Sequence, residues 1–465
     1  MRNQKKKMKV MSKRNIQQPL RMIAVVILIG AAGLSAFLAL PPSAIGDPPP
    51  GPPVIDDTAM QVVSTTIGGA QVLQTTRTVT HWFGSTLDPN NGITYGYNIV
   101  GADPNNCSGS GCDVTVTVDI IPLNVSVGEE SFNGIDAVNA VLASPVFALN
   151  DYGSTPFATA AGNFPNPPAF IRGPGGVLSQ DDAGNQLQLL DATTRAQFNK
   201  TGSSSYHLRL DPVVHDAISI VVPNGLGTVL QSSRGVHFGN VNIQWWAAQI
   251  QTFNVSFDYI DPTHLALYLT KDVLLYCPQD PFSVCSGGFH AANEAPPAGR
   301  QHNGHGNHPV QTFAWTSYLS PGLFAQPNGG SGWVLQDINV VSHEISEWAD
   351  DPFINNTVEP WLFPTFREAR LCSDLLETAD PVVNIGFAMG TNTYFQGPNP
   401  DGTQSADGYY HPQDEVFLPW FMRLAPNYIS EPTQSPSTNI GRYTLMGDLN
   451  PFASSLFHQP ATGCN

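Results

Sequence analysis

The stretch SHEISEWADDP, residues 342–352, holds the residue types and the spacing that could do chemistry. His343 and Glu347 stand one helical turn apart, and Glu344 directly follows the histidine. In an H-E-x-x-H metallohydrolase helix, the two residues one turn apart bind Zn²⁺, and the Glu beside the first acts as general base on a metal-bound water. The pattern therefore predicts a variant in which His343 and Glu347 bind a metal and Glu344 is the base.

The Glu at position 347 changes the metal that such a site would favour. A Glu four residues after His343 projects from the same helix face as the usual histidine, so the geometry permits the exchange. A carboxylate is a harder, anionic ligand, which makes the metal a weaker Lewis acid. We still expect Zn²⁺, but the exchange makes Mn²⁺ or Ca²⁺ more plausible as alternatives.

A helix must position these residues. At 100° per residue, the acidic residues fall on one face and the apolar residues form a stripe on the other. The stripe consists of Ile338, Val341, Ile345 and Trp348. Pro352 disfavours helical backbone at Asp351, so the helix should end about there. The alternative is a solvated acidic face that binds nothing, but carboxylates in the C-terminal half oppose the helix dipole and favour a counter-ion.

Segments around this helix resemble a known family. The segment SVCSGGFH ends at His290, about fifty residues before the helix, and the motif H-E-x-x-E runs on to D-P. This combination resembles the phosphate-induced protein family typified by EXORDIUM, although Ser346 and Asp350 depart from that family's pattern. The motif is also similar to a bacterial group of exported zincin-like metalloproteins. The resemblance covers about residues 270–420 and implies a mixed sheet packed against a metal-site helix.

A third metal ligand must come from outside the helix. The segment DLLETADP offers Glu377 and Asp380, which resemble the E-x-x-D that follows the helix in the bacterial group. Glu377 lies downstream of His343 in the order usual for zinc peptidases, although an acidic surface turn would explain it equally simply. Asp351 is the second candidate, and its alternative roles are to cap the following loop or to bind Ca²⁺ with the nearby asparagines.

Two further histidines are candidates for the site. His290 could bind or orient the metal, or it could be a buried structural histidine on a strand. His411, in GYYHPQDE, is a candidate catalytic donor to a tetrahedral oxyanion, with Tyr409 and Tyr410 as alternatives. The competing interpretation of His411 is a hydrogen-bonded structural role.

The N-terminus predicts export. Eight Lys or Arg precede an apolar run at residues 22–40, and small residues follow it, so residues 1–44 form a signal peptide or an N-terminal anchor. Without them, 12 Lys and Arg remain against 37 Asp and Glu. That acidity disfavours nucleic acid as a partner. We expect a secreted or cell-envelope protein that meets the membrane only through this segment; the sequence assigns no oligomeric state.

Six cysteines in an exported chain favour disulfides over thiol chemistry. Fifteen pairings are formally open. Proximity along the chain favours the pairs Cys107–Cys112 and Cys277–Cys285, which leaves Cys372 to pair with Cys464 near the C-terminus.

The remaining pattern predicts an α+β protein. Residues 45–58 are a proline-rich linker, 59–205 a β-rich N-terminal region and 206–465 a zincin-like region with a mixed sheet and the metal-site helix. The strands at about 60–130 suggest an antiparallel sheet or sandwich. Helices are expected near 133–147 and 189–200, and strands at 217–223, 241–253, 265–276 and 312–319.

Three functions fit these observations. The first is an exported metal-dependent, peptidase-like hydrolase acting on a peptide or cell-wall polymer. The second is a non-catalytic cell-envelope or glycan-associated protein whose scaffold is degenerate or binds Ca²⁺. The third is a glycoside hydrolase with two carboxylates, in which Trp245 and Trp246 contact a sugar rather than fill the core of a strand.

Overall fold

The computed structural model describes most of the chain after residue 76. The described ranges are 77–107, 112–151, 186–198, 200, 205–257, 259–278, 280–294, 309–325, 333–362, 372–383, 385–424, 443–444 and 464, with short pieces at 54–55 and 158–159. The predicted leader, residues 1–44, lies outside them, so export remains a prediction. No helix among the described residues is both long and apolar enough to cross a membrane.

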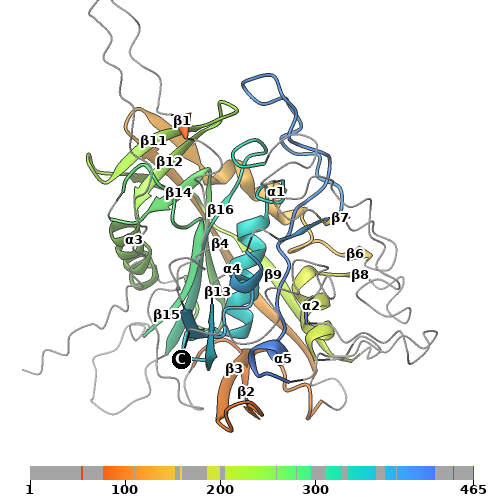
Figure 1. The fold of residues 1–465 in the computed structure, drawn as a ribbon. Coiled ribbons are helices and arrows are strands. Elements are labelled where there is room, and N and C mark those ends of the chain that lie inside the picture. The colour runs from red at the N-terminus through yellow and green to blue at the C-terminus, as the bar shows by residue number, and fades with distance from the viewer. Residues whose placement is uncertain are drawn as a thin grey trace, which may run out of the picture.

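A seven-stranded mixed sheet forms the centre of the molecule (Figure 1). Its main path runs β10-β4-β13-β16-β15, with β9 and β5 also paired to the long strand β4. Strands β9, β10 and β13 run parallel to β4, β16 runs parallel to β13, and β15 is antiparallel to β16 at the end of the path. The bounds are β4 Asp113–Val127, β5 Glu130–Asn133, β9 His207–Val214, β10 Ile218–Val221, β13 Leu265–Lys271, β15 Gly288–Glu294 and β16 Val310–Tyr318.

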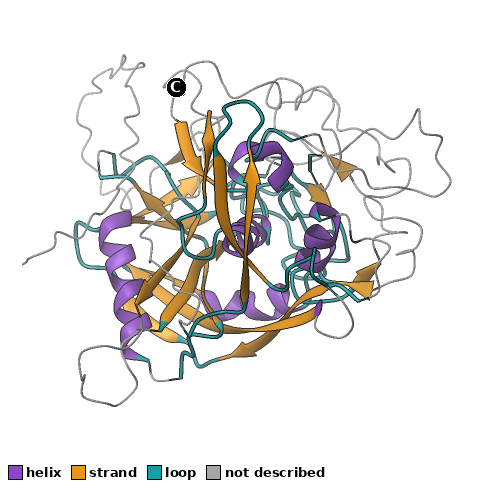
Figure 2. Cartoon of the chain, turned by 90° about the horizontal axis from the view of Figure 1, so that it is seen from below, coloured by secondary structure: helices purple, strands orange, loops and turns teal. Residues whose placement is uncertain are grey.

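Helices cover both faces of this sheet (Figure 2). Helix α4 (Asn339–Asp350) packs on one face and α3 (Ile243–Ser256) on the other. Strand β13 packs against both helices, because its alternate residues point to opposite faces of the sheet. Leu267 belongs to the core beneath α4, whereas its neighbour Tyr268 belongs to the core beneath α3. The chain is thus an α+β protein, as predicted.

Helix α4 follows its predicted pattern closely. All four residues of the apolar stripe enter one core cluster, and Trp348 donates a 3.0 Å hydrogen bond from Nε1 to Oγ1 of Thr312 in β16. The helix ends at Asp350, one residue before the position indicated by Pro352. Its acidic face is buried as well, however, so the alternative of a solvated face is wrong.

Helix α3 corrects one prediction. Residues 241–253 read as a strand, yet the chain is helical from Ile243. The side chain of Asn242 accepts a hydrogen bond from the backbone N–H of Trp245 and caps the helix. Trp246 is 0 % exposed and packs edge-on against Trp315 in the sheet. Trp246 therefore fills the core and is not placed to contact a sugar.

The expected antiparallel arrangement of residues 60–130 is only partly present. Strands β2 (His81–Leu87) and β3 (Thr94–Val100) form an antiparallel hairpin. Strand β4 pairs in parallel with strands from beyond residue 205, so the central sheet crosses the expected boundary between the two regions. The run at 265–276 also divides into β13 and β14 (Val273–Tyr276), because Asp272 has φ of 53° between them.

A second, four-stranded sheet has the order β1-β11-β12-β14. Strand β1 lies in the predicted proline-rich linker and pairs in parallel with β11. The bounds are β1 Val54–Ile55, β11 Gly227–Ser232 and β12 His237–Asn242.

Short elements complete the description. The helices include the two expected near 133–147 and 189–200. They are α1 Val138–Leu142, α2 Leu189–Gln197, α5 Leu418–Phe421 and the 3₁₀ turns Gly134–Ala137 and Asp380–Val382. The remaining strands, in paired sets, are β6 Asn150–Asp151 with β8 Gln186–Leu187, β7 Ala158–Thr159 with β19 Phe387–Ala388, and β17 Thr357–Leu362 with β18 Cys372–Leu375.

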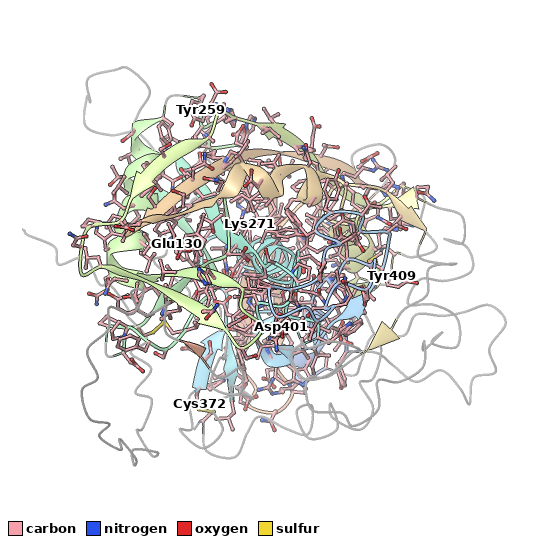
Figure 3. The ribbon with its side chains drawn as sticks, turned by 90° about the horizontal axis from the view of Figure 1, so that it is seen from above. Glu130, Tyr259, Lys271, Cys372, Asp401 and Tyr409 are labelled. Carbon is pink, nitrogen blue, oxygen red and sulfur yellow. A yellow bond between two sulfur atoms is a disulfide. The ribbon has the colours of Figure 1, made fainter. Side chains whose placement is uncertain are left out.

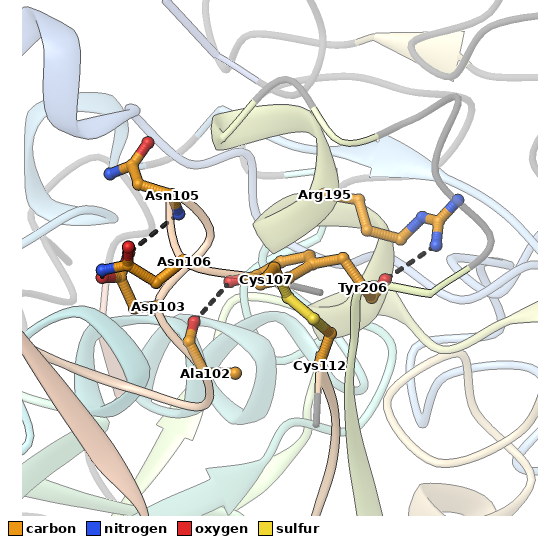
Figure 4. The surroundings of a disulfide bond; sticks show 8 residues. All are labelled: Ala102, Asp103, Asn105, Asn106, Cys107, Cys112, Arg195 and Tyr206. Carbon is orange, nitrogen blue, oxygen red and sulfur yellow. Dashed lines mark hydrogen bonds between the residues drawn. A yellow bond between two sulfur atoms is a disulfide. The ribbon is translucent and has the colours of Figure 1, made fainter. Parts of the chain in front are cut away.

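All three predicted cysteine pairs are present. The Cα–Cα distances are 5.4 Å for Cys107–Cys112, 5.8 Å for Cys277–Cys285 and 5.7 Å for Cys372–Cys464. Figure 4 shows the first bridge beside Tyr206, whose hydroxyl donates a 3.3 Å hydrogen bond to the carbonyl of Ala102. Figure 3 places Cys372 at the periphery of the molecule, where β18 begins.

Candidate metal centre

Buried acidic and histidine side chains from three parts of the chain meet between α4 and the central sheet. Strand β15 supplies one histidine, α4 supplies three residues, and the segment after β18 supplies two carboxylates. Their ligand atoms form two overlapping groups, each with all atoms within 4.8 Å of one another. The groups are His290, Glu347 and Glu377, and His343, Glu347 and Asp380.

His343 presents one ring nitrogen to the cluster. Its Nδ1 lies 3.0 Å from Oε1 of Gln413, so Nδ1 carries the proton and donates it. Nε2 then faces Oε2 of Glu347 at 3.2 Å and Oδ1 of Asp380 at 3.6 Å, and it makes no hydrogen bond with any residue that the structure describes. An imidazole oriented through its other nitrogen is the usual arrangement of a metal-binding histidine.

Gln413 ties this histidine to the rest of the site. Its backbone N–H donates to Oγ of Ser342 at 2.9 Å, and its side-chain amide donates to the carbonyl of Ala379 at 2.6 Å. One residue therefore links α4 to the segment that carries Glu377 and Asp380. Sequence reasoning singled out GYYHPQDE for His411 and did not identify Gln413.

Glu347 occupies the centre of the cluster and is 0 % exposed. Its Oε1 accepts the backbone N–H of Asp380 at 3.2 Å. Its Oε2 faces both His343 and Nδ1 of His290, the latter at 3.7 Å. The carboxylate that replaces the usual histidine is thus shared by both groups.

The alternation of strand β15 brings His290 to the site. Phe289 and Ala291 point to the core beneath α3, so His290 points to α4. Its Nδ1 lies 3.6 Å from Oε2 of Glu344, and its Nε2 lies 3.9 Å from Oε2 of Glu377. Within the described part of the chain, neither nitrogen has a hydrogen-bond partner, although His290 is 0 % exposed.

Glu344 packs against the backbone of β15 at Gly288. A Cβ atom at Gly288, two residues before His290 on the same strand face, would lie 2.5 Å from its Oε1, so glycine makes room for this carboxylate. Glu344 and His343 also line a small cavity of about 10 Å³, together with Asn339 and Gln413 among others. That volume is about the minimum that holds one water molecule.

The other two predicted site residues belong to neither ligand group. Asp351 has left the helix and uses Oδ1 to accept the backbone N–H groups of Asn355 and Asn356, at 3.0 and 3.1 Å. This is the capping role weighed as its alternative. His411 directs Nδ1 to Asp337 at 2.8 Å and Nε2 to Asp407 at 3.2 Å, so its ring is oriented by these carboxylates and not by the cluster.

The charges of the cluster call for a cation. Among the described residues, Glu344 and Asp380 form ion pairs only with histidines. Burial disfavours a charged ring at His343, but the nearby charge of Glu347 outweighs it and raises the pKa of His343 to about 10. Burial, reinforced by the charge of Glu347, raises the pKa of Asp380 well above its usual value. His343 and Asp380 therefore tend to hold protons at the positions where a buried divalent cation would fit.

The donor set fits such a cation. One imidazole nitrogen and carboxylate oxygens are ligands of Zn²⁺ and Mn²⁺. Nε2 of His343 and Oδ1 of Asp380 are buried 3.6 Å apart, and neither has a hydrogen-bond partner among the described residues. The structure groups Asp380, rather than the expected Glu377, with His343. Both were visible in DLLETADP, but only the fold could show which of them reaches His343.

Comparison with known proteins finds no matching family model, no matching curated protein and no matching solved structure.

Proposed function

We propose that this protein is an exported metal-dependent hydrolase with a peptidase-like mechanism. The observation that carries the proposal is the buried group of His343, Glu347 and Asp380, with Glu344 beside it at a cavity large enough for one water. Zn²⁺ or Mn²⁺ suits the mixed nitrogen and oxygen donors better than Ca²⁺, which prefers oxygen ligands alone. The three disulfides support export, because such bonds persist in oxidising compartments.

A divalent cation held by this group would supply positive charge that polarises a water molecule and a substrate carbonyl. Glu344 would take the proton of a water in the adjoining cavity and return it to the leaving amine. Burial raises the pKa of Glu344 above its usual 4.5, which brings the carboxylate closer to the range needed for both transfers. Gln413 would hold His343 in the tautomer that keeps Nε2 free of a proton.

A second candidate is a non-catalytic envelope protein whose metal is structural. The observation that favours it is the closure of the site, since His343 is only 4 % exposed and the cavity has no room for a peptide. Structural metal sites are closed, whereas catalytic sites keep an open position. Under this alternative, stripping the metal lowers the stability of the protein, and no substrate is turned over.

The Glu344→Gln variant tests the proposed mechanism. Hydrolysis of a mixed peptide library and of cell-wall fragments by the purified wild type would be followed by mass spectrometry, with metal content measured in parallel. Glutamine cannot accept the proton, so we expect a loss of at least about 100-fold in rate with the metal retained. The control is Glu130→Gln, because the side chain of Glu130 (labelled in Figure 3) is 39 % exposed and pairs with His237 outside the cluster.

Two results would contradict the mechanism. Full hydrolysis by Glu344→Gln would show that Glu344 is not the base. A wild type that contains metal and cleaves neither substrate class would favour the structural alternative.

A further inference from the structure

We propose that the cluster binds two divalent cations and that the carboxylate of Glu347 is shared between them. The ligand atoms form two groups that overlap only at Glu347. One ion would lie with His343 and Asp380, and the second with His290 and Glu377. This inference rests on the proposed metal site at His343 and adds to it a second position, of the same transition-metal class.

His290 is the main reason for a second ion. A buried imidazole normally forms hydrogen bonds through its ring nitrogens, because an unsatisfied polar group in the interior costs about 1–3 kcal/mol. His290 is 0 % exposed and has three carboxylates within 4 Å, and neither of its ring nitrogens has a hydrogen-bond partner among the residues described by the structure. A cation beside the ring would satisfy a nitrogen and the facing carboxylates together.

A single ion could not use all of these ligands. Metal–ligand bonds of about 2.0–2.2 Å place the ligand atoms of one ion within roughly 4.4 Å of one another. The ligand atoms of His343 and Asp380 and those of His290 and Glu377 fall into two separate groups within the 4.8 Å limit, and only Glu347 belongs to both. Oε2 of Glu347 is the atom directed to both histidines, while Oε1 is held by the backbone N–H of Asp380.

The charge of Glu344 agrees with a second ion. The two positive charges of a divalent cation beside His343 are balanced by the carboxylates of Glu347 and Asp380. Glu344 is 0 % exposed, and His290 is its ion-pair partner among the described residues. Both oxygens of Glu344 lack a hydrogen-bond partner among the described residues, and a cation bound beside His290 would offset the charge of this buried carboxylate. In two-metal hydrolases, paired cations stabilise both the attacking and the leaving oxygen.

Manganese binding to the full mature chain tests the inference. Mn²⁺ would be titrated into metal-stripped protein, with stoichiometry from elemental analysis after desalting and the electron paramagnetic resonance spectrum recorded at saturation. We expect two ions per chain and a spin-coupled spectrum, because a shared carboxylate couples neighbouring Mn²⁺ ions. His290→Asn should bind one ion and give an uncoupled six-line spectrum. The control is His264→Asn, because His264 pairs with Asp119 outside the cluster, and this variant should still bind two ions.

The outcomes separate this inference from the proposed function. One ion per wild-type chain, or two retained by His290→Asn, would overturn the shared site while leaving a metal at His343. No ion in the wild type would overturn both proposals. Should His290→Asn fail to fold, the wild-type stoichiometry and the coupling in its spectrum decide the question alone.

Discussion

Single side chains decide what this site can hold. Glu347 stands where a histidine is usual in an H-E-x-x-H helix. Its carboxylate lies close to both His343 and His290. Gln413 fixes the tautomer of His343 through its Oε1. Gly288 has no side chain, and this leaves the space that Glu344 occupies.

The Gly288→Ala variant tests whether the position of Glu344 matters. The added Cβ would lie 2.5 Å from Oε1 and 2.6 Å from Cγ of Glu344, so the carboxylate must move. We expect hydrolysis to fall about 10- to 100-fold, the loss that a displacement of roughly 1 Å can cause, while the metal at His343 stays bound. Gly397→Ala is the matched control, because a Cβ at Gly397 meets nothing within 4 Å. Unchanged hydrolysis in Gly288→Ala would argue against a catalytic Glu344.

At the scale of elements, α4 is buried on all its faces. Its apolar stripe packs on the sheet, and its acidic face contacts β15 and the segments after β17. Asp350 ends the helix as a buried carboxylate at the negative end of the helix dipole, where it accepts a 2.7 Å hydrogen bond from Gln197. A carboxylate in this position favours its protonated form.

The Asp350→Asn variant should be more stable than the wild type at neutral pH. Burial raises the pKa of Asp350 from 3.8 to about 7. Because the folded-state pKa is the higher one, wild-type stability falls as pH rises from 3.8 through about 7. Asparagine carries no charge to bury and can still accept the bond from Gln197, so its advantage should grow over this window and reach about 1–4 kcal/mol.

Thermal unfolding between pH 4 and 8 measures this effect. Asp211→Asn is the control, because Asp211 is exposed on β9 and the change should leave the unfolding temperature nearly constant across the window. An Asp350→Asn variant less stable than the wild type at pH 8 would show that Asp350 is needed as a charge.

At the scale of the whole molecule, the central sheet and the disulfides join distant parts of the chain. Strand β4 lies between strands that follow it by more than 80 residues, and Cys372–Cys464 closes a loop of sequence separation 92. By contrast, Cys107–Cys112 closes a separation of 5. The entropy removed from the unfolded chain grows with the length of the closed loop.

Serine replacements of each cysteine pair should therefore differ in cost. Loop entropy predicts a loss of about 4–5 kcal/mol for the Cys372–Cys464 pair and about 2 kcal/mol for the Cys107–Cys112 pair. Denaturant unfolding of the two double-serine variants measures both values. The reverse order would show that the long loop retains structure in the unfolded chain.

The parts that sequence could predict are those set by local periodicity. The stripe and end of α4 follow from a 3.6-residue repeat and from Pro352, and the disulfide pairs follow from proximity and elimination. Helix α3 was missed because its aromatic and β-branched residues resemble a strand until the cap at Asn242 is considered. The parallel pairing of β4 depends on partners far along the chain.

The site shows the same division. His343, Glu344 and Glu347 were identified because one helix sets their spacing. Asp380 and Gln413 join them through long-range packing that no local pattern encodes. Asp351 is the residue that follows the last turn of α4, and its Oδ1 accepts the backbone N–H groups of Asn355 and Asn356 in the next loop, which helical spacing alone does not reveal.

An anomalous diffraction map at the zinc edge, from crystals of residues 45–465 grown with Zn²⁺, would show directly whether a metal binds in the cluster. We expect a strong peak about 2.0–2.2 Å from Nε2 of His343, within bonding distance of Glu347 and Asp380. A well-ordered cluster with no anomalous peak, or zinc bound only at surface histidines, would contradict this expectation.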